Sequence, residues 1–162
     1  MSLIPGEMGP VAGLDPVRRL RVMAAATPGC VLLERFVAAP FDVVWAVAAD
    51  LENELPRYQP FVRTVRVTPR GEDRLDVRAL GNARLSADFD AVLRSGWCWM
   101  QSRHITFGLA ATPVPGGTLV GRAGSTRRRP LRRLAVPVLR RAFARELDRF
   151  EARVQARRRD DR

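Results

Sequence analysis

The segment from Val31 to Pro60 changes its hydrophobic pattern twice, and this order of patterns restricts the folds that the chain can adopt. It opens as VLLERFVA, in which β-branched and aromatic side chains fill the length of one strand. The strand should end before Pro40, because proline cannot donate to a strand ladder but fits the first turn of a helix. Asp42 falls in that turn, where the helix dipole favours a negative charge. The segment therefore predicts a strand followed directly by a helix.

Two short helical segments are expected after the proline. The apolar residues of the first segment recur at positions i, i+3, i+4 and i+7, on one helix face: Phe41, Val44, Trp45 and Ala48. Asp50 is expected to cap the second segment, LENEL, which Pro56 keeps short. Helices of this length cannot form a bundle, so we expect them to close one end of a sheet.

The middle of the chain predicts antiparallel strands joined by short turns. The segments FVRTVRVT and DRLDVRAL are separated by PRGE, and RLSADFDAVLR follows GNA. In the third segment alternate residues share one apolar face: Leu85, Ala87, Phe89, Ala91 and Leu93. One long bent strand or two shorter strands are expected in WCWMQSRHITFGLAAT, and TLVGRAGS follows the turn PVPGG. We count six or seven antiparallel strands.

The pairing of the third and fourth strand segments determines which side chains face inward. A hairpin at Ser95-Gly96 with an even-numbered loop would pair residue 93 with 98, 91 with 100, 89 with 102 and 87 with 104. The side chains then expected to point inward are Cys98, Met100, Ser102 and His104. Trp97 and Trp99 would point outward. A single bulge would reverse this assignment.

The C-terminal part of the chain has a helical period. The apolar residues after the basic run TRRRPLRR are spaced by three or four: Leu139, Phe143, Leu147, Phe150 and Val154. A separate stripe holds Arg141, Arg145, Arg149 and Arg153. We expect a long amphipathic helix, which Pro137 starts or kinks.

Composition limits the class of protein. A chain of 162 residues with 46% hydrophobic and 28% charged residues is expected to form one compact domain. No run of about eighteen apolar residues is present, so no membrane span is expected. The two cysteines, Cys30 and Cys98, form no CxxC pair, and a single histidine is present, which nearly excludes a structural zinc site. We expect reduced thiols in a cytoplasmic protein, with no metal and no cofactor.

Two segments of the chain carry a resemblance to a known superfamily, and the resemblance covers roughly residues 29–156. The segment VAAPFDVVWAVAADLENELPRYQPFVRTVRV resembles the opening of the START-like, polyketide cyclase/dehydrase and lipid-transport (SRPBCC) superfamily, and GGTLV is similar to the start of its last strand. The matching residues are Ala39, Pro40, Val44, Trp45, Asp50, Tyr58, Pro60, Val62 and Val65. The resemblance implies an α+β helix-grip fold: a curved antiparallel sheet of six or seven strands around a long C-terminal helix, with two short helices after the first strand.

The same resemblance divides the chain and predicts an internal cavity. Residues 29–157 would form the ligand-binding domain, residues 1–28 an extension in which LDPVRRLRVMAAA is an additional helix, and residues 158–162 a charged tail. The cavity between sheet and helix is expected to be lined by Trp45, Tyr58, Phe61, Phe89, Met100, Phe107, Phe143 and Leu147. Our first interpretation is therefore non-catalytic binding or transport of a small apolar ligand, such as a lipid, an isoprenoid quinone or a polyketide.

A second interpretation is a polyketide aromatase/cyclase. His104, Ser102, Tyr58 or Arg122 would then assist enolisation or dehydration in the cavity. Each has a plainer explanation: His104 as a solvent-facing or satisfied histidine, Ser102 as a hydroxyl without an activating partner, and Arg122 as half of a surface ion pair. Since such catalysis needs several converging polar groups, we favour a non-catalytic protein over an enzyme.

A third interpretation rests on the net charge of +11. Residues 1–120 carry 13 arginines against 12 acidic residues, whereas residues 121–162 carry 15 against 5. One cluster precedes the last helix: Arg127, Arg128, Arg129, Arg132 and Arg133. Such a segment attracts phosphates, which predicts peripheral docking on an anionic membrane, a ribosome or RNA, without sequence-specific readout of nucleic acid. The ligand and the oligomeric state are left open.

Overall fold

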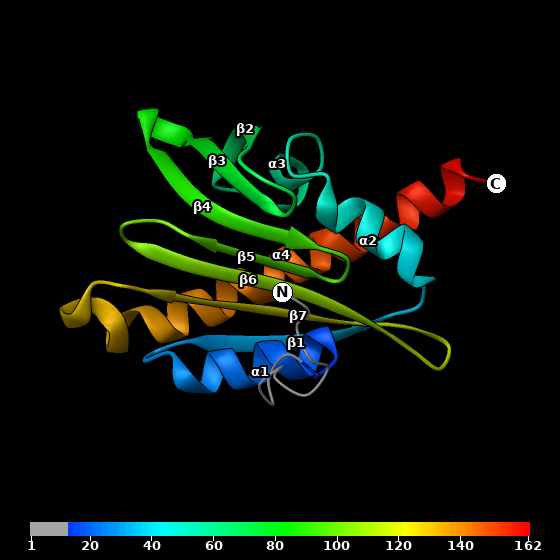
Figure 1. Ribbon diagram of the computed structural model, residues 1–162, viewed down its shortest axis with the longest axis horizontal. Helices are drawn as coiled ribbons and strands as arrows, with labels where there is room; N and C mark the ends of the chain where they lie inside the picture. Colours follow the sequence, from blue (N-terminus) through cyan, green and yellow to red (C-terminus); the bar gives the residue numbers. More distant parts are fainter. Residues whose placement is uncertain (1–12) are drawn as a thin grey trace, which may run out of the picture.

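The computed structural model describes residues 13–162, which form one antiparallel sheet with helices on both faces (Figure 1). The strands are β1 (Val31–Val37), β2 (Val62–Pro69), β3 (Arg74–Gly81), β4 (Ser86–Arg94), β5 (Trp97–Gln101), β6 (Ile105–Val114) and β7 (Gly117–Thr126). Their spatial order is β1-β7-β6-β5-β4-β3-β2, so the first strand pairs with the last one. The predicted helix-grip fold is confirmed, with seven strands.

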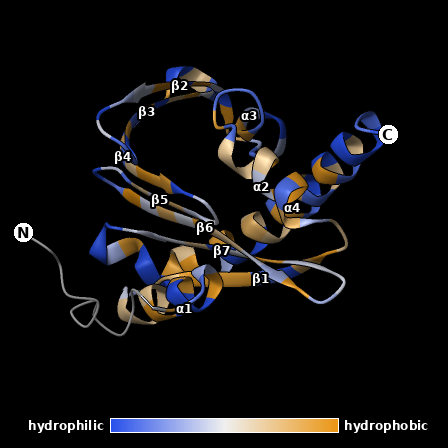
Figure 2. Ribbon diagram, turned by 45° about the vertical axis from the view of Figure 1, so that its right-hand side comes forward, coloured by the Kyte–Doolittle hydropathy of each residue, from blue (hydrophilic) through white to orange (hydrophobic). Residues whose placement is uncertain are grey.

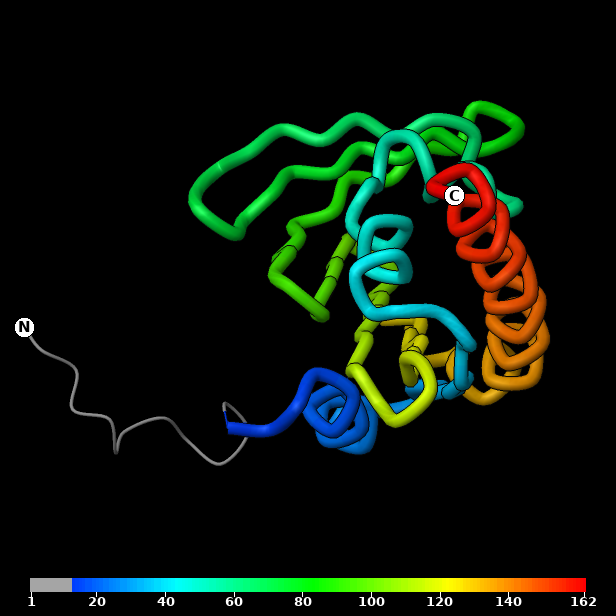
Figure 3. Tube along the Cα trace, turned by 90° about the vertical axis from the view of Figure 1, so that its right-hand side faces the viewer, coloured from blue at the N-terminus to red at the C-terminus, as the bar shows by residue number. Residues whose placement is uncertain are grey.

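The long helix α4 (Arg132–Asp160) packs along one face of the curved sheet. Figure 3 shows α4, orange to red, beside the sheet, with α2 (Phe41–Ala49), cyan, between them; α3 (Leu55–Tyr58) also packs on α4. The strand alternation supplies the inner face: Val77 and Phe89 are buried, whereas their neighbours Arg78 and Asp88 are exposed. The main hydrophobic core therefore lies between the sheet and α4.

A second, smaller core lies on the opposite face of the sheet, under α1 (Pro16–Ala26). Asp15 caps this helix by accepting a hydrogen bond from the backbone N–H of Arg18 at 3.1 Å. Figure 2 shows hydrophobic residues of α1 against the sheet, where Leu20 packs with Trp97 and Trp99. The predicted outward orientation of both tryptophans is confirmed, and α1 explains why they are nonetheless buried.

The two short helices differ in detail from the prediction. The first four residues of LENEL form a turn and not a helix, because Asp50 accepts a hydrogen bond from the Asn53 backbone N–H at 3.2 Å. Helix α3 begins at Leu55, the last residue of this segment, with Pro56 in its first turn. Proline there lacks only an N–H that would be unpaired in any case, so it starts the helix and does not end it.

The boundaries of the last helix and of β4 also differ from the prediction. The 3-10 helix η2 (Arg129–Leu131), with Pro130 in its first turn, leads into α4, so Pro137 lies inside α4 and does not start it. The helix continues to Asp160, into the expected tail. Leu85 is 70% exposed and not inward-facing, because the 3-10 helix η1 (Asn82–Arg84) precedes β4.

Residues 1–12 of the expected N-terminal extension lie outside the described residues. Within residues 13–162, no helix is both long enough and apolar enough to cross a bilayer.

Candidate functional site

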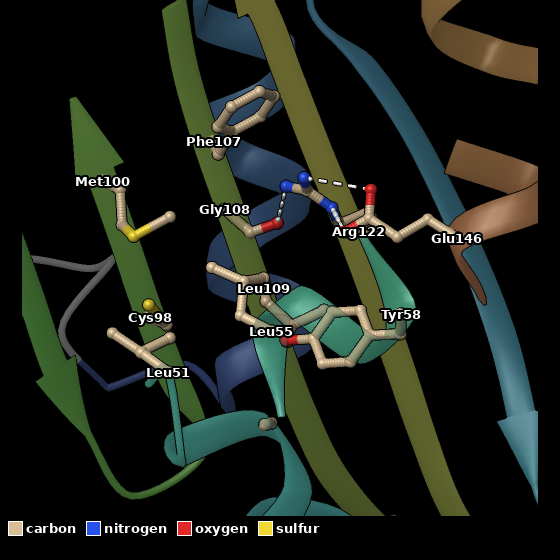
Figure 4. A pocket seen from close by; sticks show the side chains of 11 residues that line it. Leu51, Leu55, Tyr58, Cys98, Met100, Phe107, Gly108, Leu109, Arg122 and Glu146 are labelled. Atoms are coloured by element: carbon tan, nitrogen blue, oxygen red, sulfur yellow. Dashed lines mark hydrogen bonds and ion pairs between the residues drawn. The ribbon is translucent and has the colours of Figure 1, made fainter. Parts of the chain in front are cut away.

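A small cavity lies between the inner face of the sheet and the helices α3 and α4 (Figure 4). Its volume is about 20 Å³, which holds about one water molecule. The lining residues are Ala48, Leu51, Leu55, Tyr58, Cys98, Met100, Phe107, Gly108, Leu109, Arg122 and Glu146. A larger ligand can enter only if lining side chains move, and Met100, which is unbranched and flexible, can change rotamer at low cost.

The polar part of the cavity is a buried ion pair between Arg122 of β7 and Glu146 of α4. Their side chains are 6% and 4% exposed, and the Arg122 Nε and Nη2 atoms lie 2.8 and 3.2 Å from Oε1 and Oε2 of Glu146. A two-point contact of this kind fixes the plane of the guanidinium. The pair therefore joins the last strand to the long helix across the cavity wall.

Two aromatic rings hold the Arg122 guanidinium between them. Its central carbon lies 4.5 Å from the ring centroid of Phe107 and 4.6 Å from that of Phe143. Gly124 makes room for this arrangement, since a Cβ there would lie 2.6 Å from the Phe143 ring. Stacking a cation on aromatic faces lowers the cost of keeping it away from water.

Most of the hydrogen-bonding capacity of Arg122 and Glu146 is used within the protein. Arg122 Nη1 donates to the carbonyl oxygens of Gly108 at 3.3 Å and Ala123 at 3.1 Å. Gln59 Nε2 donates to Glu146 Oε2 at 3.1 Å. Four of the five N–H groups of a guanidinium are thereby occupied, which leaves one on Nη2.

Tyr58 supplies a second polar group to the cavity. Its ring packs edge-on against Phe150, with 5.1 Å between the ring centroids. Burial, and secondarily the negative charge of Glu146, raises the pKa of Tyr58, so the phenol stays neutral. Figure 4 shows the Tyr58 hydroxyl turned into the cavity, and no hydrogen bond to it is found within residues 13–162. It is thus a neutral donor without a protein partner there.

The remaining groups around the cavity are apolar or serve to position the helices. Burial raises the pKa of the Cys98 thiol to about 12, so Cys98 is protonated and unreactive at neutral pH. Glu54, at the N-terminus of α3, receives hydrogen bonds from Arg153 of α4 at 2.8 and 3.0 Å. This ion pair ties α3 to α4 and so places Tyr58.

Of the side chains expected to line the cavity, Tyr58, Met100 and Phe107 do so. Phe143 contacts the Arg122 guanidinium, and Phe89 and Leu147 belong to the surrounding core. Trp45 is half-buried on α2, parallel to Phe41 at 6.3 Å between the ring centroids. Phe61 is 67% exposed and lies outside the lining. Contact of any of them with a ligand stays a prediction.

The predicted register is right for two residue pairs and ends there. Leu93 pairs with Cys98 and Ala91 with Met100, as expected. The ladder stops at Gln101, because the Ser102 backbone N–H donates to the Ile105 carbonyl at 2.9 Å and forms the β5–β6 turn. The expected pairs 89 with 102 and 87 with 104 are therefore absent from the sheet.

That turn removes two catalytic candidates from the cavity. The Ser102 hydroxyl accepts hydrogen bonds from the backbone N–H groups of His104 and Ile105, at 3.3 and 3.1 Å, and serves the turn. His104 is exposed, with the Arg128 Nε 3.4 Å from its Nδ1. The inward orientation predicted for His104 is wrong, and neither residue lines the cavity.

The interpretation of Arg122 as half of a surface ion pair is also wrong, because the pair is buried. Its partner Glu146 was missed by reasoning from the sequence. A signal was nevertheless present: Glu146 lies three residues after Phe143 and next to Leu147, so it falls on the apolar helix face. A carboxylate on such a face requires a buried cation.

No group of three or more histidine, cysteine, aspartate or glutamate side chains that could hold a metal ion is found in the described part of the chain.

Comparison with known proteins identifies the fold and the family. Residues 29–155 match the family described as polyketide cyclase / dehydrase and lipid transport. No curated protein matches the chain. Solved structures with a similar fold include the Zhui aromatase/cyclase from Streptomyces sp. R1128, with a TM-score of 0.62 and 17% identity, covering 79% of this chain and 94% of that one.

Two further structures resemble the chain to a similar degree. The di-domain ARO/CYC StfQ of the steffimycin biosynthetic pathway has a TM-score of 0.66 and 14% identity, covering 86% of this chain and 54% of that one. A protein of Thermus thermophilus has a TM-score of 0.62 and 20% identity, covering 78% and 97%. At these identities the likeness shows the fold alone. Because the family match spans most of the chain, the chain belongs to the polyketide cyclase / dehydrase and lipid transport family.

Proposed function

We propose that the protein binds a small, mostly apolar ligand that carries a carbonyl or quinone oxygen, and that the cavity around Arg122 is the binding site. One observation carries the proposal. The buried Arg122 guanidinium is held between two aromatic rings and keeps an N–H beyond those used by the protein. The Tyr58 hydroxyl is a second donor in the same cavity. A ligand oxygen would accept hydrogen bonds that no protein group takes up.

The rest of the lining selects for an apolar body. Ala48, Leu51, Leu55 and Leu109 surround the two donors, and the neutral thiol of Cys98 adds no charge. Such a lining is typical of small-molecule sites, in which few polar groups orient a ligand that apolar contacts hold. An isoprenoid quinone or a cyclic polyketide fits a cavity with two hydrogen-bond donors in an apolar lining better than a phospholipid does, because the cavity has no second cation for a phosphate.

The test is to narrow the cavity without changing its polar groups. Ala48 lines the cavity, whereas Ala110 is equally buried in the core under α1. Ala48→Leu and Ala110→Leu should each cost about 1–3 kcal/mol of stability through overpacking. Only Ala48→Leu should abolish binding of decylubiquinone, measured by isothermal titration calorimetry. Equal loss of binding in both variants would refute the cavity as the site.

A second measurement separates the contribution of hydrogen bonding to the quinone oxygen from the contribution of burying the alkyl chain of the ligand. Decylubiquinone should bind at least about tenfold more tightly than an alkylbenzene of equal chain length, since a hydrogen bond to a charged donor contributes about 1.5–3 kcal/mol. Tyr58→Phe should reduce this ratio. Native mass spectrometry of the protein purified from its own host would identify the retained compound, and a pure hydrocarbon there would contradict the role of Arg122.

Polyketide cyclisation is the second candidate function, favoured by one observation: a cation and a neutral phenol line the same cavity. Arg122 would stabilise the negative charge that develops on a carbonyl oxygen during enolisation, and Tyr58 would donate to it. Both Glu146 oxygens are already hydrogen-bonded, so no free carboxylate base lines the described cavity. This ranks catalysis below binding. Turnover of a poly-β-ketone thioester that Tyr58→Phe slows, while binding is kept, would reverse the order.

Docking on an anionic surface, the remaining interpretation, rests on a different part of the molecule. The arginines concerned lie at the start of α4 and outside the cavity lining.

A further inference from the structure

The connections at one end of the sheet differ in charge from those at the other end. The pairing places residues 59–61, 81–85, 102–104 and 127–131 together with the first turns of α4, because β2, β4 and β6 start there and β3, β5 and β7 finish there. In Figure 1 this end lies at the left, with η1 in green and the start of α4 in yellow and orange. We call it the basic end.

The basic end carries many arginines and no carboxylate. Its basic residues are Arg84, Arg103, His104, Arg127, Arg128, Arg129, Arg132 and Arg133, and the four connections and residues 132–138 contain no aspartate or glutamate. None of these arginines takes part in an ion pair within residues 13–162. At the opposite end two arginines at the hairpin loops have carboxylate partners, Arg94 with Asp73 and Arg70 with Asp76.

Large apolar side chains are exposed at the same end. Of the eight large hydrophobic side chains exposed in the described structure, five lie there: Phe61 (67%), Leu85 (70%), Leu131 (46%), Leu134 (72%) and Val138 (68%). Leu134 and Val138 are one helical turn apart on α4. Phe143, which faces the core, is nine residues after Leu134, or about two and a half turns, so the exposed pair lies on the opposite side of the helix. This apolar surface has no partner within the described chain.

We propose that the basic end docks on an anionic lipid bilayer, with the arginines at the phosphate level and the leucines inserted below it. Unpaired arginines and exposed leucines on one surface match the two layers of a bilayer interface, which offers negative charge outside and hydrocarbon inside. The N-terminus of α4 points its positive dipole to the same surface. A nucleic acid complements the charge but not the leucines, and Phe61 is the one aromatic side chain among the five, too few for stacking on bases.

Vesicle flotation tests this docking surface. Vesicles of equal parts phosphatidylglycerol and phosphatidylcholine should bind the protein, vesicles of phosphatidylcholine alone should bind it far more weakly, and added salt should release it. Leu134→Ser should weaken partitioning by about tenfold. Each change in Arg129→Gln and Arg133→Gln should weaken it by about fivefold.

Matched controls use the opposite end and the cavity. Phe36→Ser removes a 50% exposed apolar side chain near the other end of β1, and Arg159→Gln with Arg162→Gln removes the same charge at the far end of α4. Both should leave vesicle binding within about twofold, because Phe36 lies too far from the docking surface to insert into the bilayer and the two arginines lie beyond a Debye length from it. Ala48→Leu should also leave it unchanged, so docking can hold or fail independently of ligand binding.

Three outcomes would overturn the proposal. The first is equal binding of the protein to neutral and anionic vesicles. The second is an equal loss of vesicle binding in the variants of the basic end and in those of the opposite end. The third is binding to single-stranded RNA that Leu134→Ser leaves intact, while vesicle binding is absent. The last result would assign the arginines to RNA.

Discussion

Removing one partner of the buried pair should destabilise the protein much more than removing both. Glu146→Leu leaves the Arg122 guanidinium charged among Phe107, Phe143 and the leucines of the cavity, without the carboxylate oxygens that accept two of its hydrogen bonds. Two hydrogen bonds to a charged group contribute about 1.5–3 kcal/mol each. Breaking a buried pair typically costs about 3–5 kcal/mol, which agrees with that sum. We expect a decrease of this size in the free energy of unfolding, a large part of the ~5–15 kcal/mol that stabilises a domain.

The double variant Arg122→Met, Glu146→Leu should recover most of that stability. Methionine keeps the contact with both rings, and a thioether packs favourably on aromatic faces. Gln59 loses its acceptor but is only half-buried, so water can replace it. The double variant should therefore lie within about 2 kcal/mol of the parent, since an apolar replacement of a buried pair is often neutral.

Urea unfolding followed by circular dichroism measures the free energy of unfolding of the parent, Glu146→Leu, Arg122→Met and the double variant. The four values can be compared if the free energy depends on urea concentration with the same slope in all four proteins. The exposed pair Arg74 and Asp90 provides the control, because Arg74→Met with Asp90→Leu should show no measurable coupling. A loss below about 1 kcal/mol for Glu146→Leu, or a double variant as unstable as the sum of the singles, would refute the reasoning. Either result would mean that water reaches the pair.

The packing around the site has three further measurable consequences. The hydrogen bonds from Arg153 lower the pKa of Glu54, so the stability that they contribute is present above the ordinary pKa of 4.5 and is lost as the pH falls through the lower folded-state pKa. The urea midpoint of Glu54→Gln should therefore fall less on acidification than the urea midpoint of the parent. Because burial raises the pKa of Cys98 to about 12, this thiol should react with iodoacetamide at pH 8 only after unfolding, and rapid native alkylation would contradict its protonated, buried state. Gly108→Ala places a Cβ 2.7 Å from Leu20 and 2.8 Å from the Trp99 ring, which should lower stability by about 1–3 kcal/mol in thermal unfolding, and the loss in the double variant with Leu20→Ala should be smaller than the sum of the two single losses.

The local elements of the fold could be predicted because their patterns have unambiguous periods. Alternation over Ala87, Phe89 and Ala91 predicts a strand with one buried face, and the spacing of Phe143, Leu147 and Phe150 predicts one buried helix stripe. The structure buries these residues as expected, apart from the half-buried Ala87. The resemblance of the segment after Pro40 to a known superfamily then supplied the arrangement of the elements, which periodicity alone does not contain.

The register could be predicted only as far as the ladder extends. Pairing Leu93 with Cys98 follows from a two-residue turn, but the length of β5 depends on where the next turn forms. The Ser102 side chain closes that turn by accepting backbone hydrogen bonds, and the strand pattern carries no sign of this competition. Alternation therefore predicts that His104 points inside, whereas it lies outside in the structure.

The sequence by itself determined the sheet, the helices, the buried face of each and the excess of arginine near the start of α4. Only the tertiary structure decided which charges pair. Arg122 and Glu146 are 24 residues apart in the chain, on elements whose relative position depends on the curvature of the whole sheet. The same is true of the basic end, because its arginines and leucines come from four connections and the first turns of α4, which antiparallel pairing and helix packing bring together. Local periodicity reports how one element meets water, whereas a site made of several elements exists only once packing has placed them side by side.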